Sequence, residues 1–575
     1  MKLTIALALT GAVLAAARPA LADPPKLVVI LVVDQMRGDY IQRYGGQWTK
    51  GLRRLVDEGA LFPQAAYPYF TTVTCAGHAT IGTGTFPMTH GQIQNGWFDR
   101  DLGKDVACTD DLSVKQISYG TQDAARTGGN SGARLLAPTF ADELRSQASH
   151  APRVVSLSMK PRSAIGLAGH AGDVVLWYDT GKGWATSSAY ATEKNPLIQK
   201  FLEANPISRE LGSPWTKLLS ESAYFYEDDG LKENPEQGWA TVFPHAFLTP
   251  AGAPPDDAAY ERWENSPFAD AYLGRMAVAL ADGLKLGQTA GHTDFLAIGF
   301  SAVDRVGHAF GPRSHEVQDT LARLDRTIGD LLSALDTRVG RGNYVLALSA
   351  DHGVSPIPEQ MAQLHVDAGR IDGASLTTKV SQALAAKLGT GKLLEKITNP
   401  YVYLAPGVYE KLRAKPEALQ AVIEAITSVP GIARVLTRDQ LERGVDTDDA
   451  IIRAARLSYY APRSGDLLIV QKPYWLTGTG GASHGTPYLY DQRVPVLFFG
   501  AGVKPGRYWQ NASPADIAPT LAALCGITLP RPDGHVLGEA LAATSSSRPS
   551  SGAVSPPAAS KTSSSPGGTG SGRPH

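Results

Sequence analysis

The chain has 575 residues, of which 43% are hydrophobic and 19% are charged, and its formal net charge is −1. This length allows one large domain with insertions, or two or three domains, and the composition is that of a globular protein. A net charge near zero argues against nucleic-acid binding that is driven by bulk charge.

The N-terminus has the pattern of an export signal. One Lys precedes an apolar run over residues 3–17, and small residues follow at Ala20 and Ala22. We therefore expect residues 1–22 to be a secretory signal peptide that is cleaved after Ala22, which predicts a periplasmic or secreted protein. An uncleaved membrane anchor is the alternative, but the apolar run is short for a membrane span.

Apolar, β-branched runs predict the buried strands of a parallel sheet. These runs are Leu27–Val33, Val154–Met159, Phe295–Phe300, Tyr344–Ser349 and Val494–Phe499. Helical patterns lie between them, and the clearest are Glu316–Leu335, with Ser314 as its N-cap, and Ala515–Leu524. This alternation predicts an α/β fold with a mostly parallel sheet and helices on both faces.

Two segments do not follow the alternation. Residues 180–290 are rich in Trp, Tyr, Pro and acids, and residues 355–480 contain strands of their own. We interpret both as insertions that cover the active face of one catalytic domain, which spans residues 23–544. Residues 545–575 are mainly Ser, Pro, Gly and Ala, so we expect a disordered tail.

Cysteine is sparse. The chain contains Cys75, Cys108 and Cys525. An exported chain with three cysteines has at most one internal disulfide and one leftover thiol, and the sequence does not reveal the pairing.

An aspartate follows three of the predicted strands. Asp34 follows the first strand, Asp304 lies just past Phe295–Phe300, and Asp351 follows Tyr344–Ser349. Active residues gather at the carboxyl ends of strands in such sheets, so these carboxylates are candidate metal ligands. Any one of them, taken alone, could instead cap a turn or a helix.

Three histidines accompany these aspartates. Asp304 and His308 are four residues apart, which places both on one side of a helical turn, whereas His352 is adjacent to Asp351. His484 lies in a Gly-rich turn. Zinc binds His nitrogen and Asp oxygen, and the low thiol content favours zinc over iron–sulfur or copper chemistry. Three Asp and three His suit two zinc ions, with calcium or manganese as alternatives where carboxylates dominate.

A Thr-rich loop supplies a candidate nucleophile. Thr71, Thr72 and Thr74 precede a segment of small residues. A hydroxyl at a helix N-terminus beside a metal ion can ionise and attack a phosphate ester. Simple N-capping is the alternative, and the spacing alone does not choose among the three residues.

Two cations follow the second predicted strand. We expect Pro161 to keep the backbone extended, so that Lys160 and Arg162 project to the same side. Two cations on one side suit the oxygens of a terminal phosphate, although a solvated surface pair is the alternative.

These residues together resemble the alkaline phosphatase superfamily, over roughly residues 25–540. The chain is similar to bacterial periplasmic zinc alkaline phosphatases with a Thr nucleophile, which are related to nucleotide pyrophosphatase/phosphodiesterases. In that family the nucleophile lies four residues before a His, and a His-Gly-x-x-x-Asn segment follows. Thr74 precedes His78 by four residues, and His90 to Asn95 complete the pattern. The resemblance therefore selects Thr74.

The resemblance also implies the ligands and the phosphate contacts. One Zn²⁺ would be held by Asp34, Thr74, Asp351 and His352, and a second by Asp304, His308 and His484. Asn95 would donate to a phosphate oxygen, and Lys160 and Arg162 resemble the Lys-x-Arg pair of the phosphomonoesterase branch.

The predicted function is a secreted two-zinc alkaline phosphatase that hydrolyses phosphate monoesters through a phospho-Thr74 intermediate. A phosphodiesterase or nucleotide pyrophosphatase on the same scaffold is the first alternative, and an exported metal-containing binding protein is the second. The sulfatase motif C/S-x-P-x-R fails, because Gly77 and Ala79 occupy its Pro and Arg positions. The expected partners are small phosphate esters, with no nucleic-acid scaffold and no stable membrane insertion. The sequence does not determine the oligomeric state, although a monomer is favoured.

Overall fold

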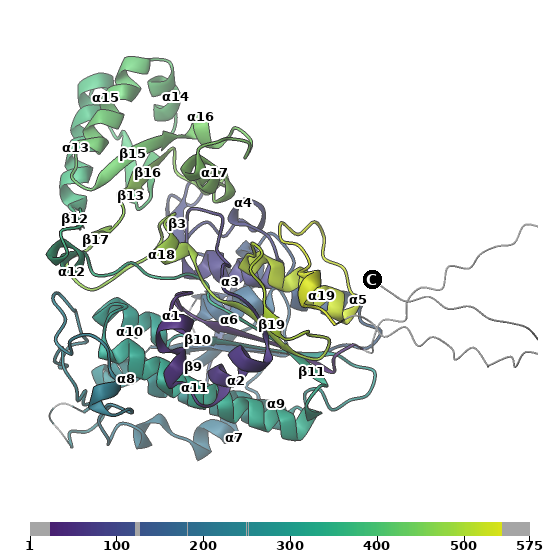
Figure 1. Cartoon of the computed structure of the whole chain (residues 1–575). Helices are drawn as coiled ribbons and strands as arrows, with labels where there is room; N and C mark the ends of the chain where they lie inside the picture. Colours follow the sequence, from purple (N-terminus) through teal and green to yellow (C-terminus); the bar gives the residue numbers. More distant parts are fainter. Residues whose placement is uncertain (1–23, 121–126, 181, 249, 251, 543–575) are drawn as a thin grey trace, which may run out of the picture. The chain divides into compact units, whose positions relative to one another are not determined.

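The computed structural model describes residues 24–120, 127–180, 182–248, 250 and 252–542 (Figure 1). The expected signal peptide and the Ser/Pro/Gly tail both lie outside these residues. None of the described helices combines the length and the apolar composition needed to cross a membrane.

A parallel sheet forms the centre of the fold. Within the described part of the chain it has 11 strands, in the order β19-β2-β18-β11-β1-β10-β7-β8-β9-β5-β6. The central strands are β8 (Val174–Asp179), β7 (Val154–Ser158), β10 (Asp294–Phe300), β1 (Leu27–Val33) and β11 (Tyr344–Ser349), and they are parallel to one another. Four of the five predicted strands are therefore confirmed as parallel, with β8 in addition.

The strands that extend the sheet on both sides pair antiparallel, except that β19 and β2 at one edge are parallel to each other. On one side lie β18 (Val496–Gly500), β2 (Ala60–Phe62) and β19 (Gly506–Arg507), and on the other β9 (Gly183–Ser187), β5 (Asp110–Ser118) and β6 (Thr127–Asn130). The strand predicted at Val494–Phe499 thus exists, but it runs antiparallel to β11. The direction of β18 is set by the place at which the chain enters this strand. Gly353, just after β11, donates to the carbonyl of Asp491, just before β18, so the chain enters β18 where β11 ends.

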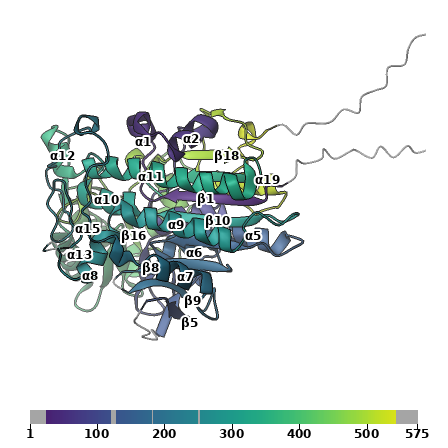
Figure 2. The ribbon, with the colours of Figure 1, turned by 90° about the horizontal axis from the view of Figure 1, so that it is seen from below.

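Helices cover both faces of the sheet, as predicted (Figures 1 and 2). One face carries α9 (Pro267–Gly283), α11 (His315–Leu335) and α2 (Gly51–Glu58), and the other carries α3 (Thr74–Thr83), α5 (Phe140–Gln147), α6 (Pro161–Ala168) and α19 (Ile517–Cys525). Alternate residues of β1 enter the two cores, Leu31 on one side and Ile30 on the other, because side chains alternate along a strand.

The two helices predicted from sequence are present. The helix expected at Glu316–Leu335 is α11, and its N-cap Ser314 accepts a hydrogen bond from the backbone N–H of Val317. The segment expected at Ala515–Leu524 is a 3₁₀ turn over Pro514–Asp516 that leads into α19.

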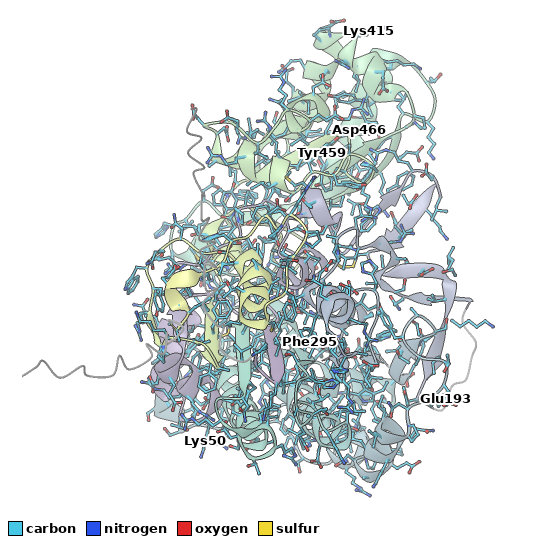
Figure 3. The ribbon with its side chains drawn as sticks, turned by 90° about the vertical axis from the view of Figure 1, so that its right-hand side faces the viewer. Lys50, Glu193, Phe295, Lys415, Tyr459 and Asp466 are labelled. Atoms are coloured by element: carbon cyan, nitrogen blue, oxygen red, sulfur yellow. A yellow bond between two sulfur atoms is a disulfide. The ribbon has the colours of Figure 1, made fainter. Side chains whose placement is uncertain are left out.

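Part of the segment 355–480 builds a second sheet with its own core. Its strands are β13 (Leu394–Thr398), β14 (Tyr401–Leu404), β16 (Leu467–Gln471) and β15 (Ile432–Thr437), all antiparallel. Helices α13 (Gly373–Leu388) and α15 (Pro416–Thr427) pack on it. Figure 3 labels Lys415 and Asp466 in this segment and Phe295 in the central sheet. The remaining elements here are α12 (Pro358–Gln363), β12 (Gly369–Ile371), α14 (Val408–Arg413), α16 (Arg438–Leu441), α17 (Ala450–Leu457) and β17 (Trp475–Thr477).

The two ends of this segment lie side by side. The backbone N–H of Val354 donates to the carbonyl of Tyr490 at 2.9 Å, and that of Ser355 donates to the carbonyl of Ser483 at 3.0 Å. The segment therefore leaves and rejoins the main body at one place.

Helix α3 approaches the end of β11 very closely at Gly77. A Cβ atom at this position would lie 2.2 Å from the carbonyl oxygen of Asp351 and 2.5 Å from its Cβ. The absence of a side chain at Gly77 is therefore what allows α3 to sit against Asp351.

We expect Gly77→Ala to lower the free energy of unfolding by about 1–3 kcal/mol, because the added methyl group forces α3 away from Asp351. Urea unfolding of the mature protein measures this change. Gly46→Ala is the matched control, since nothing lies within 4 Å of its Cβ position. Equal stability of the two variants would show that the contact at Gly77 is not tight.

Candidate metal centre

Three buried aspartates meet at the carboxyl edge of the parallel strands. Asp34 follows β1, Asp351 is separated from β11 by one residue, and Asp304 lies in the first turn of α10 (Ala302–Phe310), just after β10. Their side chains are at most 5% exposed. Asp270 of α9 fixes the start of α10 by accepting from the backbone N–H groups of Ser301 and Ala302, at 2.8 and 3.1 Å. The parallel register therefore brings carboxylates from distant parts of the chain together.

The predicted histidines join these aspartates in one cluster. His352 Nε2 lies 3.5 Å from Asp34 Oδ1 and 3.4 Å from Asp351 Oδ2. His308 Nε2 lies 3.2 Å from Asp304 Oδ1, as the helical spacing of four predicted, and His484 Nε2 lies 3.8 Å from the same oxygen.

Two groups of ligand atoms are close enough to hold a metal ion. In the first, atoms of Asp34, Asp351 and His352 all lie within 4.8 Å of one another, and in the second so do atoms of Asp304, His352 and His484. The first group matches the predicted protein set without Thr74. The second has His352 in the place predicted for His308. The rings of His352 and His484 stack with centroids 3.5 Å apart, so the two groups adjoin.

Each histidine is oriented by a backbone carbonyl. The Nδ1 atoms of His308, His352 and His484 contact the carbonyl oxygens of Ala482, Gly353 and Thr72, at 2.9, 2.9 and 2.8 Å. A ring that donates through Nδ1 keeps a lone pair on Nε2, which is the atom that faces the aspartates. Burial, together with His352 and His308, also holds the pKa of His484 well below its ordinary value, so this ring is neutral at pH 7.

The cluster has an excess of buried negative charge. Lys160 Nζ contacts Asp34 Oδ2 at 2.6 Å and Asp304 Oδ2 at 2.5 Å. Burial would raise the pKa of Asp304, but Lys160 and His308 hold it well below its ordinary value. Burial and the neighbouring carboxylates of Asp304 and Asp351 raise the pKa of Asp34 well above its own.

Two carboxylate oxygens of this cluster make no hydrogen bond with any described residue. They are Asp34 Oδ1 and Asp351 Oδ2, and both are buried. Buried carboxylates that lack partners are strongly destabilising unless a cation offsets them. Oxygen and imidazole donors with neutral rings are the ligands that zinc takes, so these residues fit divalent metal ions.

Of the three threonines in the loop, only Thr74 faces this cluster. It is the first residue of α3, it is 1% exposed, and its Oγ1 lies 3.5 Å from His352 Nε2. Thr71 Oγ1 donates instead to Ser458 Oγ, and Thr72 Oγ1 donates to the carbonyl of Thr486. The geometry therefore separates Thr74 from its neighbours, which the spacing alone did not.

The phosphate-binding candidates flank the cluster, but the backbone differs from the prediction. Lys160 is the N-cap of α6 and Pro161 is its first residue, so the predicted extended backbone is wrong there. Proline is favoured at the first helical position because its fixed φ suits the helix and its missing N–H is not needed. Lys160 consequently contacts the carboxylates, while Arg162 lies in the first turn of α6.

Arg162 and Asn95 have unused donors. Arg162 makes no hydrogen bond or ion pair among the described residues, and burial lowers the pKa of its guanidinium. Asn95 Oδ1 accepts from the backbone N–H of Cys75 at 2.9 Å, which leaves its amide nitrogen to donate elsewhere.

The sequence reasoning missed two residues that hold the aspartates. His78 Nδ1 lies 3.0 Å from the carbonyl oxygen of Thr74 and 3.2 Å from Asp351 Oδ2. Gln35 donates through Nε2 to Asp304 Oδ1 at 2.7 Å, and through its backbone N–H to Asp351 Oδ1 at 3.1 Å. The sequence signal for His78 is its place in the family pattern, four residues after Thr74, and the signal for Gln35 is its place directly after Asp34.

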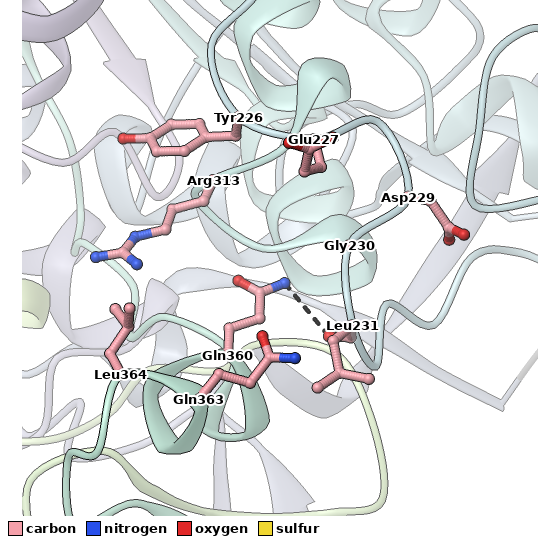
Figure 4. Close-up of a pocket in the computed structure, with 9 residues that line it drawn as sticks. All are labelled: Tyr226, Glu227, Asp229, Gly230, Leu231, Arg313, Gln360, Gln363 and Leu364. Atoms are coloured by element: carbon pink, nitrogen blue, oxygen red, sulfur yellow. Dashed lines mark hydrogen bonds between the residues drawn. The ribbon is translucent and has the colours of Figure 1, made fainter.

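A surface pocket of about 510 Å³ is lined by residues that include Arg313, Leu231 and Gln360 (Figure 4). Directly after Leu231, the carbonyl of Lys232 accepts from the N–H of Gly481, and the N–H of Asn234 donates to the carbonyl of Ala309. The chain that leaves this pocket is therefore bonded to residues near His484 and His308.

Comparisons with known proteins identify the family to which the chain belongs. The family model of type I phosphodiesterase/nucleotide pyrophosphatase matches residues 28–487. The chain is 33% identical to alkaline phosphatase PhoV of Synechococcus elongatus over 517 residues, covering 88% of this chain and 91% of that protein. It is 32% identical over 522 residues to a protein of Myroides odoratus named calcium-transporting ATPase, covering 88% and 93%.

The fold is that of a solved alkaline phosphatase. PafA of Elizabethkingia meningoseptica is 32% identical over 520 residues, covering 88% of this chain and 92% of that protein. A crystal structure of PafA matches with a TM-score of 0.82 and 31% identity, covering 91% of this chain and 100% of the other. A structure of a PafA variant matches with a TM-score of 0.83 and 30% identity, covering 91% of this chain and 100% of the other. That variant has substitutions of a Thr, an Asn, a Lys and an Arg.

Proposed function

Since this chain belongs to the type I phosphodiesterase/nucleotide pyrophosphatase family, within the alkaline phosphatase superfamily, we propose that it is an exported alkaline phosphatase. It hydrolyses phosphate monoesters with two Zn²⁺ ions and a phospho-Thr74 intermediate. The observation that carries this proposal is the Thr74 hydroxyl, which lies beside two groups of metal-ligating atoms. The charge of the buried Arg162 guanidinium interacts with the aspartates of both groups.

Two sets of residues would hold the ions. Asp34, Asp351, His352 and Thr74 form the first, and Asp304, His308 and His484 form the second. When bound, the ions would lower the pKa of a coordinated hydroxyl and offset charge on the ester oxygens. The unpartnered buried oxygens of Asp34 and Asp351 support this assignment.

Thr74 acts as the nucleophile. Its Oγ forms a bond to phosphorus as the bond between phosphorus and the ester oxygen breaks, which yields phospho-Thr74 and releases the alcohol. Water then cleaves phospho-Thr74, restores the hydroxyl and releases inorganic phosphate. The fixed position of Thr74 at the start of α3 orients Oγ for this attack.

Arg162 and Asn95 recognise the phosphoryl oxygens. A guanidinium can bind two of these oxygens at once, and an amide N–H can donate to one of them. A monoester has a third charged oxygen where a diester has a substituent, so an unpaired Arg162 favours monoesters over the diester alternative. The PafA variant, which is substituted at a Thr, an Asn, a Lys and an Arg, supports the choice of Thr74, Asn95, Lys160 and Arg162.

We expect about two zinc ions per mature chain, measured by inductively coupled plasma mass spectrometry. A chelator is expected to abolish hydrolysis of p-nitrophenyl phosphate, and added Zn²⁺ to restore it, because buried carboxylates and neutral imidazoles supply both sites. Full turnover by metal-free chain would contradict the two-zinc mechanism, whereas no hydrolysis of any ester by the zinc-loaded chain would favour the binding-protein alternative.

Thr74→Ala is expected to lower kcat for p-nitrophenyl phosphate by roughly 10³-fold or more, because it removes the group that forms the covalent intermediate. Acid quenching with ³²P-labelled substrate should label the wild type and leave this variant unlabelled, with its zinc content unchanged. Thr71→Val is the control and should still be labelled, since Thr71 bonds to Ser458. A labelled Thr74→Ala variant would place the nucleophile elsewhere.

For Arg162→Ala we expect kcat/KM for a phenyl monoester to fall about 10- to 100-fold, the loss of a charge-assisted contact worth roughly 1.5–3 kcal/mol. The kcat/KM for the matching diester should change far less, so the ratio of monoester to diester kcat/KM should fall. Arg326→Ala removes an exposed charge from α11 and controls for the general field of the protein. Equal losses for both esters would refute the role given to Arg162.

A further inference from the structure

A disulfide begins one residue after the proposed nucleophile. Cys75, the second residue of α3, is bonded to Cys108. Cys108 directly follows β4 (Lys104–Ala107), which pairs with β3 (Gly96–Asp99). Cys525 in α19 is buried and free, so the three cysteines form one internal disulfide and leave one thiol, as the sequence predicted.

Both cysteines of this disulfide donate a backbone hydrogen bond to Asn95. Its side-chain Oδ1 accepts from the backbone N–H of Cys75 at 2.9 Å, and its backbone carbonyl accepts from the N–H of Cys108 at 3.0 Å. The covalent bond and the two hydrogen bonds thus link the same three residues in a closed ring. Because Oδ1 is occupied by Cys75, the amide nitrogen is the end of the side chain that remains to donate.

The hairpin that carries Asn95 has little other support from strand pairing. Strands β3 and β4 form a separate two-stranded sheet among the described residues, and a two-stranded hairpin is only marginally stable by itself. Three of the four residues of β4 are exposed. The buried side of the hairpin, with Trp97 and Val106, packs in the same apolar cluster as Cys75 and Cys108.

We propose that the Cys75–Cys108 disulfide is a positioning device for Asn95, which holds the side-chain amide at the start of α3, where a bound phosphoryl group would accept from it. Opening the disulfide frees the hairpin, so that turnover falls through Asn95 while the fold and the metal ligands remain. This inference rests on the proposed roles of Thr74 and Asn95, and it makes both cysteines positioning residues for the reaction.

A double-mutant cycle tests the proposal. Cys75→Ala/Cys108→Ala is expected to lower kcat/KM for p-nitrophenyl phosphate about 10-fold in the wild-type background, the size of one well-placed hydrogen bond to a charged group. In the Asn95→Ala background the same change should have less than about a 2-fold effect, because the group that it positions is absent. Cys525→Ala, which removes a buried sulfur from α19, is the control and should keep the wild-type value. Equal losses in both backgrounds would overturn the proposal, since a purely structural disulfide acts without Asn95.

Hydrogen exchange gives a readout that does not depend on catalysis. The hydrogen bond to Asn95 protects the amide at position 75, so a peptide over the start of α3 should exchange faster in the Cys75→Ala/Cys108→Ala variant, with zinc content unchanged. Unchanged exchange would overturn the positioning role whatever the kinetics show. A wild-type kcat/KM in Asn95→Ala would also overturn the positioning proposal. Thr74 would still be labelled in that case, so the result would leave the proposed phosphatase mechanism standing.

Reduction of the folded wild type provides the same test where a variant does not fold. A water-soluble phosphine, with Zn²⁺ present in excess, supplies two electrons to the disulfide. The sulfurs gain two protons and become thiols, and the phosphine becomes its oxide by taking oxygen from water. Activity should fall about 10-fold in wild type and in Cys525→Ala and should not fall in Cys75→Ala/Cys108→Ala. Full activity of the reduced wild type, with free thiols verified by alkylation, would overturn the proposal.

Discussion

The concentration of buried carboxylates at one edge of the sheet is the constraint on which the site depends. Asp34, Asp304 and Asp351 are nearly inaccessible to solvent, and Lys160 contacts only two of them. Such an arrangement is unfavourable in a protein interior unless further positive charge is present. The rings of His352 and His484, whose pKa values burial lowers, do not supply that charge, so the residues as a set are complementary to divalent cations.

Contacts with the surrounding backbone and with α3 hold this unfavourable cluster of carboxylates in position. Asp34, Asp304 and Asp351 follow strands of the sheet, and backbone carbonyls orient the rings of His308, His352 and His484. Gly77 lets α3 reach the carbonyl of Asp351, and His78 on the same helix contacts its carboxylate. Thr74 is therefore positioned by the same helix that supports one of the aspartates, so nucleophile and metal ligands are placed by shared contacts.

Sequence periodicity was sufficient for the elements whose residues are buried on both sides, such as β1 and β11, and for the amphipathic α11. Periodicity failed to predict features that depend on contacts beyond the local segment. The direction of β18 depends on where the chain enters the sheet, and the turn at Pro161 depends on α6 continuing beyond it. The cluster of Asp and His was predictable because strand ends are marked in the sequence. The roles of Gln35 and His78, and the Cys75–Cys108 pairing, require three-dimensional proximity that no local pattern records.

The paired ends of the segment between His352 and His484 bring distant parts of the chain together. Val354 bonds to Tyr490 and Ser355 to Ser483. Residues inside the segment also bond to the loop before α3, since Phe70 donates to the carbonyl of Ala454 and Thr71 donates to Ser458. The segment that separates two metal-ligand candidates in the sequence therefore also supports the loop that leads to Thr74.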